Sequence, residues 1–444
     1  MSRPTTTHTW SNWAGQQRCS PAVVEDPRTE SQVVDAIGRA AEAGHVVRAV
    51  GSGHSFTDTC LTDDCHIRLG GLSGLLDADR ATGLVRVGAG MRLHDLTRAL
   101  HTHGLALENQ GDIDQQTVAG ALATGTHGTG REFRNLSAAV VGCRIALADG
   151  TVRDLTAEST PDLLRAARVS IGALGVITEF TLRAVPAFRL RKVEEPRPLV
   201  ETLDAFDDLS AAHDHFELYA FPYAKTCLSF ASDRTDEPPA PLPAWRKWLV
   251  DDLVANRGLE LFSRAGRSFP GQAPRISRTM TRVLSRDVRV DHSHLVFSSE
   301  RRVRFTEMEY AIPRAHAATA LRAVLAMIES DGVGVTFPIE LRTTAPDDAF
   351  LSTASGRDTA YIAVHQFQGM PYEAYFRAVE AIMDGFGGRP HWGKRHFQTA
   401  ETLAPRYPEW DRFAAARAEL DPAGRFTNDY VRRTLGPPPA EVHA

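Results

Sequence analysis

The stretch that decides the fold is residues 46–55, VVRAVGSGHS, where a short apolar run passes directly into two glycines and a histidine. An apolar run of this length, bounded by a glycine turn, predicts a buried strand at residues 46–50. The turn behind it brings several backbone N–H groups together, and such a turn can hold a diphosphate without basic side chains. Taken alone, the pattern is more often an ordinary glycine turn.

A second stretch of small residues follows at 117–130, TVAGALATGTHGTG, and predicts a short helix that enters a glycine-rich loop. Two such loops in one half of the chain could close on opposite sides of an extended ligand, so their combination is more specific than either alone. The chain has neither the dinucleotide fingerprint GxGxxG nor the phosphate loop GxxxxGK[ST], which removes the sequence support for NAD and ATP. Inside the second loop, His127 is interpreted as a hydrogen-bonding turn residue rather than a catalytic one.

Around these loops the chain predicts alternating strands and helices. One helix should begin after Thr29, whose hydroxyl can cap it, and Gly44 can end it. The pair Asp149 and Gly150 between two alternating runs predicts a hairpin. Further predicted elements are strands at 66–69, 84–87 and 176–182, helices at 93–100 and 161–168, and, in the second half, strands at 333–342 and 361–367 and a helix at 372–386.

The length and composition of the chain bound its class. At 444 residues it is longer than one hydrophobic core usually serves, which predicts two domains or one domain with a large insertion. Pro, Arg and aromatic residues become more frequent near residue 185, so we expect a domain boundary there. A net charge of -5 weighs against a nucleic-acid partner. Without a signal-like N-terminus or an apolar run of about 20 residues, we expect a cytoplasmic protein with no membrane span.

Cysteine and histidine usage gives no metal signature. Five cysteines without a CxxC pair predict free thiols rather than disulfides or a zinc ribbon. The 17 histidines include no HExxH motif, and His391 and His396 are five apart, so they do not share a helix face. We therefore expect no metal site. His101 and His103 are expected on the exposed side of their helix.

A series of motifs runs in order along the chain: NWAG near Asn12, RAVGSGHSFTD at 48–58, GLALENQG at 104–111, ATGTHGTG at 123–130, AARVSIGALGVIT at 166–178, FPIELR at 337–342, GRPHWGK at 388–394 and LDPAGRFTNDY at 420–430. In these motifs the chain resembles the sugar-1,4-lactone oxidases. This branch of the vanillyl-alcohol oxidase flavoprotein superfamily includes L-gulono- and D-arabinono-1,4-lactone oxidases and alditol oxidases. The resemblance is weakest from residue 185 to about residue 301, where no motif is found.

The resemblance implies an α+β fold of two domains. One is an FAD-binding domain of the vanillyl-alcohol-oxidase (PCMH) type, and the other is an α+β cap domain with a mainly antiparallel sheet that covers the flavin ring. We expect the FAD-binding domain at 1–185 and the cap domain, which binds the substrate, at 186–390. A C-terminal segment at 391–436 should line the active site and return to the FAD-binding domain, and residues 437–444 should be a disordered tail.

In many relatives the histidine of the GHS turn is bonded to the 8α-methyl group of the flavin, which implies covalent FAD at His54. Relatives with another residue there hold FAD without the bond, and the alternative is a free His54 that only touches FAD. A covalent tether raises the flavin potential and prevents loss of the cofactor. No cysteine lies at 111–130, so a second, cysteinyl attachment is not expected. The other residues that the resemblance places at FAD are Gly51, Ser52, Gly53, Ser55, Gly111, Asp112, Thr117, Gly120, Ala123, Thr124, Gly125, His127, Gly128, Gly175, Val176, Ile177 and Lys394.

Four residues are candidates for catalysis. Glu340 and Arg342 are two apart in a predicted strand, so both side chains leave on one face. From the residues alone a surface ion pair is the better interpretation, but the resemblance turns this pair toward a hydroxyl-rich substrate below the cap. The resemblance also places Lys394 near the substrate and the pyrimidine end of the flavin, where its charge would stabilise anionic reduced flavin. His365 is a possible base for the carbinol proton, because histidine titrates near neutrality.

The resemblance implies an oxidoreductase that oxidises a CH–OH group of a sugar-1,4-lactone by hydride transfer to flavin N5. At Gly111, a very small side chain in the family leaves room for O2, which favours an oxidase that yields H2O2. The family also includes dehydrogenases that use cytochrome or quinone-like acceptors. Two alternatives stay open: an alditol, polyol or amino-sugar oxidase with the same groups, and a flavin-carrying binding protein with a silent site.

Overall fold

The strand predicted at 46–50 is β4, Val47–Val50, an edge strand of a three-stranded parallel sheet in the order β3–β5–β4. The computed structural model describes residues 8–243, 258–299 and 302–438. Both end residues of β4 are buried, as the apolar run requires. Its neighbours are β3, Val23–Glu25, and β5, Cys65–Arg68. Because β4 ends at Val50, the glycine turn that follows leaves the sheet as an open loop.

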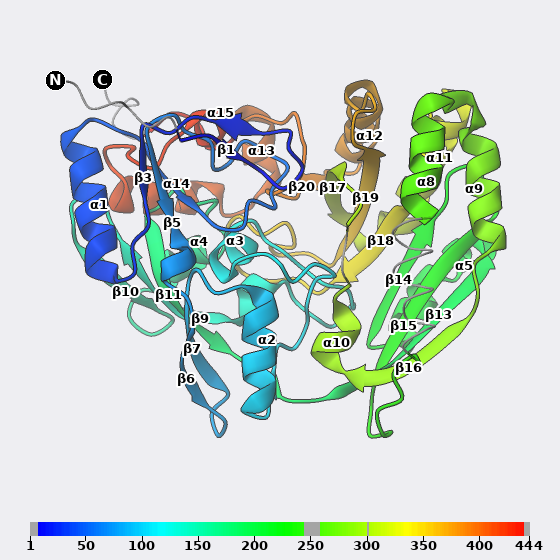
Figure 1. Ribbon diagram of the computed structural model, residues 1–444, viewed down its shortest axis with the longest axis horizontal. Coiled ribbons are helices and arrows are strands. Elements are labelled where there is room, and N and C mark those ends of the chain that lie inside the picture. Colours follow the sequence, from blue (N-terminus) through cyan, green and yellow to red (C-terminus); the bar gives the residue numbers. More distant parts are fainter. Residues whose placement is uncertain (1–7, 244–257, 300–301, 439–444) are drawn as a thin grey trace.

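A five-stranded antiparallel sheet in the order β10–β9–β11–β7–β6 packs into the same core (Figure 1). The hairpin predicted at Asp149 and Gly150 joins β9 to β10, and Val152 of β10 lies opposite Ala146 of β9. Its strands are β6 Leu75–Asp79, β7 Leu84–Gly88, β9 Val140–Ala146, β10 Val152–Thr156 and β11 Val176–Arg183. Two small pairs accompany it, β1 Trp10–Ser11 with β2 Arg18–Cys19, and β8 Leu105–Ala106 with β12 Val185–Pro186.

The first helix begins at the predicted capping residue. The hydroxyl of Thr29 accepts a hydrogen bond from the N–H of Gln32 at 3.3 Å and caps α1, Glu30–Glu42. The predicted helix at 161–168 is α4, Pro161–Arg168, with proline in its first turn. The other two helices are α2, Leu93–Thr102, and α3, Val118–Ala123, which Thr117 caps and which leads into the second glycine-rich loop.

The second half forms an eight-stranded sheet in the order β16–β13–β15–β14–β18–β19–β17–β20, and its strand pairs are antiparallel. The strands are β13 Arg189–Pro198, β14 His215–Ala220, β15 Thr226–Thr235, β16 Asp287–His292, β17 Phe305–Pro313, β18 Ile339–Thr344, β19 Thr359–Phe367 and β20 Arg389–Pro390. The predicted α+β architecture with a mainly antiparallel sheet is thereby confirmed.

The strand predicted at 333–342 is wrong in its first part, since β18 starts only at Ile339. Pro338 lacks an N–H to donate to a neighbouring strand. Before it, the N–H of Val335 donates to the carbonyl of Val333 at 2.8 Å in a tight turn. The apolar side chains of Val335 and Phe337 are therefore buried in an irregular segment rather than in a strand.

Helices pack on one face of the eight-stranded sheet and close a second core. The helices α11, Ala317–Ser330, and α12, Glu373–Asp384, bury Leu321 and Phe376 among sheet residues that include Leu341. The other helices of this half, within residues 8–243, 258–299 and 302–438, are α5 Leu199–Asp204, α6 Phe206–Ala212, α8 Leu259–Ser268, α9 Ala273–Arg282 and α10 Ser293–Phe297. Short 3-10 helices are η1 Leu69–Gly71, η2 Leu136–Ala139, η4 Pro270–Gln272, η5 Arg314–His316 and η6 Ala404–Arg406.

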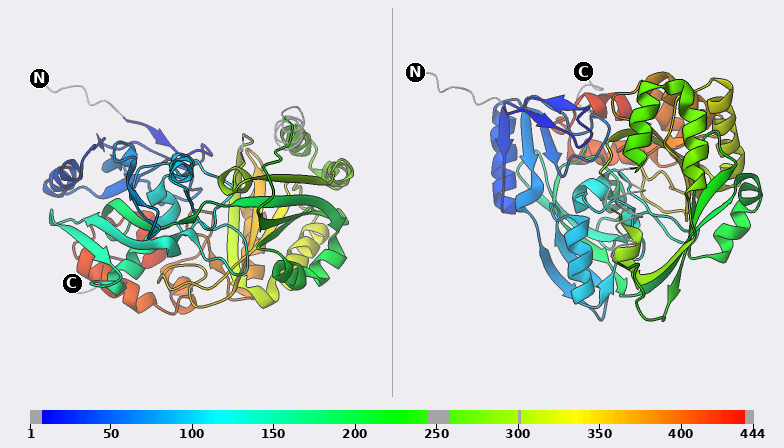
Figure 2. Two further views of the ribbon diagram at one scale, coloured as in Figure 1. Left: turned by 90° about the horizontal axis from the view of Figure 1, so that it is seen from below. Right: turned by 45° about the vertical axis from the view of Figure 1, so that its right-hand side comes forward.

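The C-terminal part of the chain returns to the N-terminal sheets. Trp392, Phe413 and Phe426 belong to the same core as those sheets, and Figure 2 shows the C-terminal helices beside them. These helices are α13 Ala400–Leu403, α14 Trp410–Leu420 and α15 Asp429–Leu435. We call the N-terminal sheets with these helices the first lobe, and the eight-stranded sheet with its own helices the second lobe. The boundaries at 185, 390 and 436 stay predictions, and most of the tail at 437–444 lies outside the described residues.

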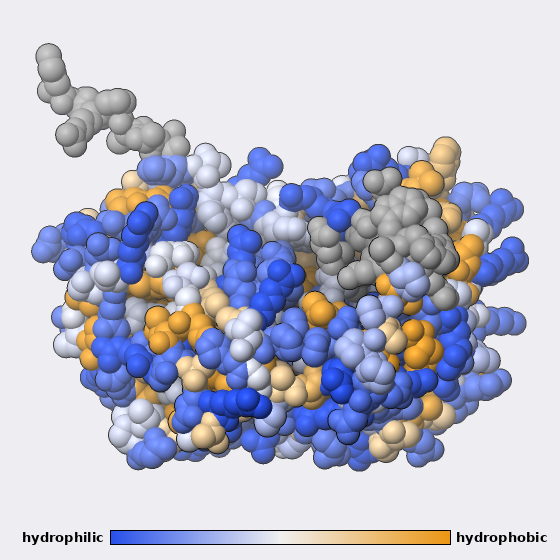
Figure 3. Space-filling view, turned by 60° about the horizontal axis from the view of Figure 1, so that its bottom comes forward, coloured by the Kyte–Doolittle hydropathy of each residue, from blue (hydrophilic) through white to orange (hydrophobic). Residues whose placement is uncertain are grey.

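The cysteines, the described helices and the face drawn in Figure 3 do not indicate a functional site. All five cysteines are free, as predicted. None of the described helices is both long and apolar enough to cross a membrane. On the face drawn in Figure 3, hydrophilic residues predominate and hydrophobic residues form small separate groups. The cavities described next lie in the interior and between the two lobes.

Candidate active site

One face of the eight-stranded sheet carries polar side chains at neighbouring positions of four strands. In one row, Tyr219 of β14 lies opposite Glu340 of β18, which lies opposite Ala363 of β19, which lies opposite Glu309 of β17. Residues two apart in a strand share a face. The same face therefore also carries the residues two positions away, which are Glu217, Arg342, His365 and Glu307. Intervening residues such as Leu341 face the helical core.

Arg342 is held by three carboxylates. Its guanidinium lies 2.8 Å from Glu340, 2.7 Å from Glu217 and 3.3 Å from Asp112. Burial alone would lower the pKa of Arg342, but Asp112, Glu217 and Glu340 together raise it well above its usual value. A guanidinium fixed in this way keeps both its charge and its orientation, so it can present a rigid donor fork to a ligand.

Lys394 is buried against two carboxylates of β17. Its Nζ lies 2.5 Å from Oε1 of Glu307 and 3.1 Å from Oε2 of Glu309. Burial alone would lower the pKa of Lys394, but these two carboxylates raise it, so the ammonium stays charged. Burial would also raise the pKa of both carboxyl groups, yet Lys394 and neighbouring histidines keep both pKa values below the usual range. The three charges therefore depend on one another.

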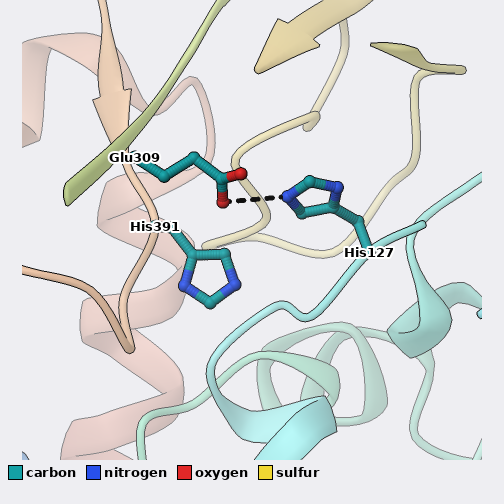
Figure 4. A group of neighbouring side chains, drawn as sticks. All are labelled: His127, Glu309 and His391. Atoms are coloured by element: carbon teal, nitrogen blue, oxygen red, sulfur yellow. Dashed lines mark hydrogen bonds and ion pairs between the residues drawn. The ribbon is translucent and has the colours of Figure 1, made fainter. Parts of the chain in front are cut away.

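Glu309 also contacts two histidines from other parts of the chain (Figure 4). Nε2 of His127 lies 3.0 Å from Oε2 of Glu309, and the ligand atoms of His127, Glu309 and His391 lie within 4.8 Å of one another. Burial and Lys394 lower the pKa of His391 to about 3, so its ring is neutral. Such a trio has the donor types of a zinc site. However, the ammonium of Lys394 already lies 3.1 Å from the same Glu309 oxygen, so we interpret the trio as part of the Lys394 ion-pair network.

His365 lies between the Arg342 and Lys394 groups. Its Nδ1 faces the carbonyl of Pro338 at 3.3 Å, and its Nε2 lies 3.3 Å from Glu307 and 3.9 Å from Glu340. Burial alone would lower the pKa of His365, but Glu307 and then Glu340 raise it above the ordinary value of 6.5. The ring therefore becomes a proton acceptor only above its raised pKa.

These groups line a cavity of about 1110 Å³ between the lobes, which we call the interlobe cavity. Part of this volume is open to solvent. All four predicted catalytic residues, Glu340, Arg342, His365 and Lys394, lie on its wall. The aromatic and apolar side chains on the wall include Trp13, Tyr219, Val303, Phe305 and Phe337.

A second cavity of about 860 Å³ lies within the first lobe, and we call it the glycine-lined cavity. Most of its wall is made of three segments, which are the end of β4 with the glycine turn at residues 48–55, α3 with its flanks at residues 116–124, and the loop at residues 170–175. Four residues line both cavities, which are His54, Ser55, Gln116 and Thr124. One elongated ligand can therefore occupy both.

The glycine-lined cavity has the chemistry of a diphosphate site. Among the described residues, no carboxylate lines it, and the N–H groups of residues 52–55 donate to no other described residue. A Cβ at Gly51 would lie 2.1 Å from Oγ1 of Thr117, so the loop can approach α3 this closely only with glycine. The adjoining outer cavity is lined by three arginines, Arg28, Arg68 and Arg92. An FAD diphosphate fits this set of donors.

His54 lies where the two cavities meet. Its ring stacks on Trp13, with ring centroids 5.6 Å apart. Burial and the nearby Arg92 lower the pKa of His54 to about 4, so the imidazole is neutral near pH 7. A neutral imidazole nitrogen has the free electron pair that a bond to carbon requires.

Most of the predicted cofactor residues reach these cavities. On the interlobe cavity lie His54, Ser55, Gly111, Asp112, Thr124, His127 and Lys394. On the glycine-lined cavity lie Gly51, Ser52, Gly53, His54, Ser55, Thr117, Gly120, Ala123, Thr124, Gly175 and Ile177. The remaining three, Gly125, Gly128 and Val176, line neither. Gly125 follows α3 with φ 74°, and Val176 pairs with Ala146 in the sheet, so both shape the backbone.

Several residues of the site were not predicted from the sequence. Glu217, Glu307 and Glu309 are the clearest, although a signal for them existed. In FELYA at 216–220 and FTEMEYAIP at 305–313, acidic residues alternate with apolar ones, as Glu340 and Arg342 do in FPIELR. Such a charge on the polar face of a buried strand must find a partner.

Known proteins resemble the chain over nearly its whole length. A family model described as D-arabinono-1,4-lactone oxidase matches residues 180–434, and one described as FAD binding domain matches residues 21–156. The chain is 51% identical over 428 residues to L-gulono-1,4-lactone dehydrogenase of Mycobacterium tuberculosis, covering 96% of this chain and 99% of that protein. It is 33% identical to L-gulonolactone oxidase of Mus musculus and to alditol oxidase of a Streptomyces species, covering in both cases 96% of this chain and 98% of the relative.

Among solved structures, cholesterol oxidase from Brevibacterium sterolicum is similar with a TM-score of 0.82 at 18% identity, over 97% of both chains. At that identity the likeness shows the fold alone. The family models and relatives agree with the two cavities described above. The chain belongs to the D-arabinono-1,4-lactone oxidase family and is an FAD-dependent oxidoreductase that acts on CH–OH groups.

Proposed function

We propose that the chain oxidises a CH–OH group of a sugar-1,4-lactone of the L-gulono- or D-arabinono-1,4-lactone type. The observation that carries the proposal is the junction at His54, where a carboxylate-free, N–H-rich cavity continues into one that is lined by Glu340 and Arg342. The names of the Mycobacterium tuberculosis and Mus musculus relatives support a gulonolactone-type substrate.

FAD, when bound, supplies the group that accepts the hydride from the carbinol carbon of the substrate. The N–H groups of residues 52–55 would hold the diphosphate of FAD, and a ring nitrogen of His54 would be bonded to the 8α-methyl carbon of its flavin ring. Lys394 supplies a fixed positive charge that stabilises the negative charge developing in the site during reduction. Its buried pairing with Glu307 and Glu309 supports this role, because the charge cannot be lost by deprotonation.

Arg342 and Glu340 bind the hydroxyl-rich substrate. The guanidinium donates to the oxygens of the lactone, and the carboxylate accepts from its hydroxyls. Because three carboxylates already orient Arg342, substrate binding does not have to order this side chain. Phe305 and Phe337 offer an apolar wall for the carbon face of the sugar.

The proton of the reacting hydroxyl passes to Nε2 of His365, and this assignment predicts a pH dependence. Only the neutral ring accepts a proton, so kcat/KM should rise with pH through the pKa of His365, which Glu307 and Glu340 raise above 6.5 despite burial. In His365→Asn this rise should disappear. The measurement is kcat/KM from about pH 5.5 to 9.5, with the exposed His103→Asn as the control that keeps the rise. A rise that persists in His365→Asn would assign the base to another group.

We assign O2 as the electron acceptor, with H2O2 as the product, because Gly111 leaves the wall of the interlobe cavity without a side chain. A Cβ at this position would lie 3.1 Å from the carbonyl oxygen of His127 and 3.4 Å from Cγ2 of Thr126, so alanine fits after a small shift and fills the space. In Gly111→Ala the O2-dependent rate should fall about tenfold, while anaerobic turnover with a dye acceptor stays within about twofold. Equal loss of both rates would contradict a role in O2 access.

A dehydrogenase with a cytochrome or quinone-type acceptor is the second candidate, and the name of the 51% identical relative favours it. One experiment distinguishes the oxidase from the dehydrogenase. An oxidase consumes O2 during steady-state turnover of the wild-type protein, whereas a dehydrogenase reduces cytochrome c or a quinone and leaves O2 untouched.

The substrate class is tested with a panel of sugar-1,4-lactones, alditols and amino sugars. We expect turnover of L-gulono- or D-arabinono-1,4-lactone and bleaching of the bound flavin by the same compound under anaerobic conditions. Turnover confined to non-lactones would make the chain an alditol or amino-sugar oxidase, a class to which one 33% identical relative belongs by name. A flavin that no compound of the panel bleaches would indicate a binding protein.

A further inference from the structure

Three histidines meet on the outside of the molecule where the two lobes touch. His101 lies in the last turn of α2 in the first lobe. His292 ends β16, and His294 lies in the first turn of α10, both in the second lobe. Figure 1 and Figure 2 both show α2 beside α10. His103 is exposed as predicted, but His101 is only half-exposed because it packs against the other two rings.

The three rings lie near one another. Their centroids are 4.2 Å apart for His101 and His292, 4.9 Å for His101 and His294, and 6.2 Å for His292 and His294. A tetrahedral zinc ion binds imidazole nitrogen at about 2.0–2.1 Å, which puts the centroids of two ligating rings about 5 Å apart. The observed separations lie on both sides of that value, so one shared ion requires the rings to rotate about their side-chain bonds until one nitrogen of each meets it.

The ring nitrogens are available for such an ion. Within the described ranges 8–243, 258–299 and 302–438, no ring nitrogen of these three histidines is hydrogen-bonded to another residue. By contrast, His94 on the same helix is bonded to Asp114, and His103 to the carbonyl of Ala99. All three rings of the trio are partly exposed, so an ion can reach them from solvent.

Charged groups of both signs lie around the trio. Arg98 and Arg189 oppose a cation here, whereas Asp291 and the carbonyl end of α2 favour it.

We propose that His101, His292 and His294 form a binding site for one borderline divalent metal ion such as Zn²⁺, which links α2 of the first lobe to α10 of the second. A solvent molecule completes the tetrahedral coordination. The link fixes the segment after α10, in which the N–H of Ser299 donates to the carbonyl of Asp112 at 3.0 Å. This site is separate from the two cavities and does not depend on the proposed reaction.

The test uses tag-free holoenzyme that has been treated with EDTA and dialysed, titrated with ZnCl2 by isothermal calorimetry. Wild type and the neighbouring control His103→Ala should each bind one equivalent of Zn²⁺ and show a higher Tm with zinc present. The single variants His101→Ala, His292→Ala and His294→Ala should each bind zinc at least about tenfold more weakly and lose the rise in Tm. Flavin absorbance and circular dichroism show that each variant is folded.

Absence of stoichiometric zinc binding to the wild type would overturn the proposal. Wild-type zinc affinity in any one of the three alanine variants would also overturn it, because each ring is assigned as a ligand. A further variant replaces His101, His292 and His294 together by alanine. Zinc that binds this triple variant as tightly as the wild type would place the ion elsewhere, for example at His127, Glu309 and His391, and would overturn the proposal.

Discussion

Replacing Arg342 by methionine is expected to lower kcat/KM by a factor on the order of 10²–10⁴, the equivalent of losing about 3–5 kcal/mol at a buried charge. Methionine keeps an unbranched side chain as long as the arginine stem, so the main change is the loss of the guanidinium. Glu340, Glu217 and Asp112 all lie within 3.3 Å of that group and would face one another without a cation. Substrate binding would lose its donor fork, and the carboxylates would take up protons or spread apart.

The variant Arg342→Lys distinguishes the effect of the positive charge from the effect of the planar guanidinium geometry. Lysine keeps one positive charge but cannot present a planar fork to three carboxylates, so we expect a loss between those of wild type and Arg342→Met. The matched control is Arg322→Met, because Arg322 forms a surface pair with Asp204 in the same lobe, with 42% and 66% of the side chains exposed. It should stay within about twofold of wild type. A folded Arg342→Met that retains wild-type kcat/KM would exclude Arg342 from substrate binding.

Replacing Lys394 by methionine is expected to lower the free energy of unfolding by about 3–5 kcal/mol near pH 8, since it leaves Glu307 and Glu309 buried without their cation. Adding Glu307→Gln should restore part of this stability, because it removes one of the two uncompensated charges. Urea unfolding followed by circular dichroism measures both effects, and the exposed Lys225→Met is the control. No change in the free energy of unfolding would contradict the ion-pair network.

Lys394→Met should also reverse the pH dependence of the contribution that Glu307 and Glu309 make to the free energy of unfolding. In the wild type the pKa values of Glu307 and Glu309 lie below their usual range, so their stabilisation is complete above the unfolded-state pKa and is lost as the pH falls. Without Lys394, burial dominates and raises both pKa values. The deficit of Lys394→Met should therefore shrink as the pH is lowered, and a deficit that is constant from pH 8 to about pH 5 would contradict this electrostatic cause.

Local signals explain how much of the fold the sequence predicts. Thr29 caps α1, the glycine turn ends β4, and the hairpin at Asp149 and Gly150 forms as expected, because each depends on neighbouring residues. The error ahead of Pro338 shows the limit of an apolar run as a strand signal, since that proline cannot join the ladder on its N–H side.

The site is less predictable, because it depends on which strands become neighbours. Glu340 and Arg342 are recognisable because they share one strand, but Glu217 and Glu309 come from β14 and β17, which flank the β18–β19 pair in the sheet. The order of eight strands is not a local property of the chain. The meeting of His101 with His292 depends in the same way on how the two lobes pack.

The attachment of FAD at the junction of the two cavities is tested most directly by denaturing the purified protein in acid and asking where the yellow colour goes. We expect the colour to stay with the polypeptide and a flavin mass on the proteolytic peptide that contains His54. In His54→Ala the colour should be released to the supernatant, because the loop at residues 51–55 then holds FAD without a bond. Release of the flavin from the unmutated protein would contradict a covalent bond at His54, and a protein purified without any flavin would contradict the cavity assignment itself.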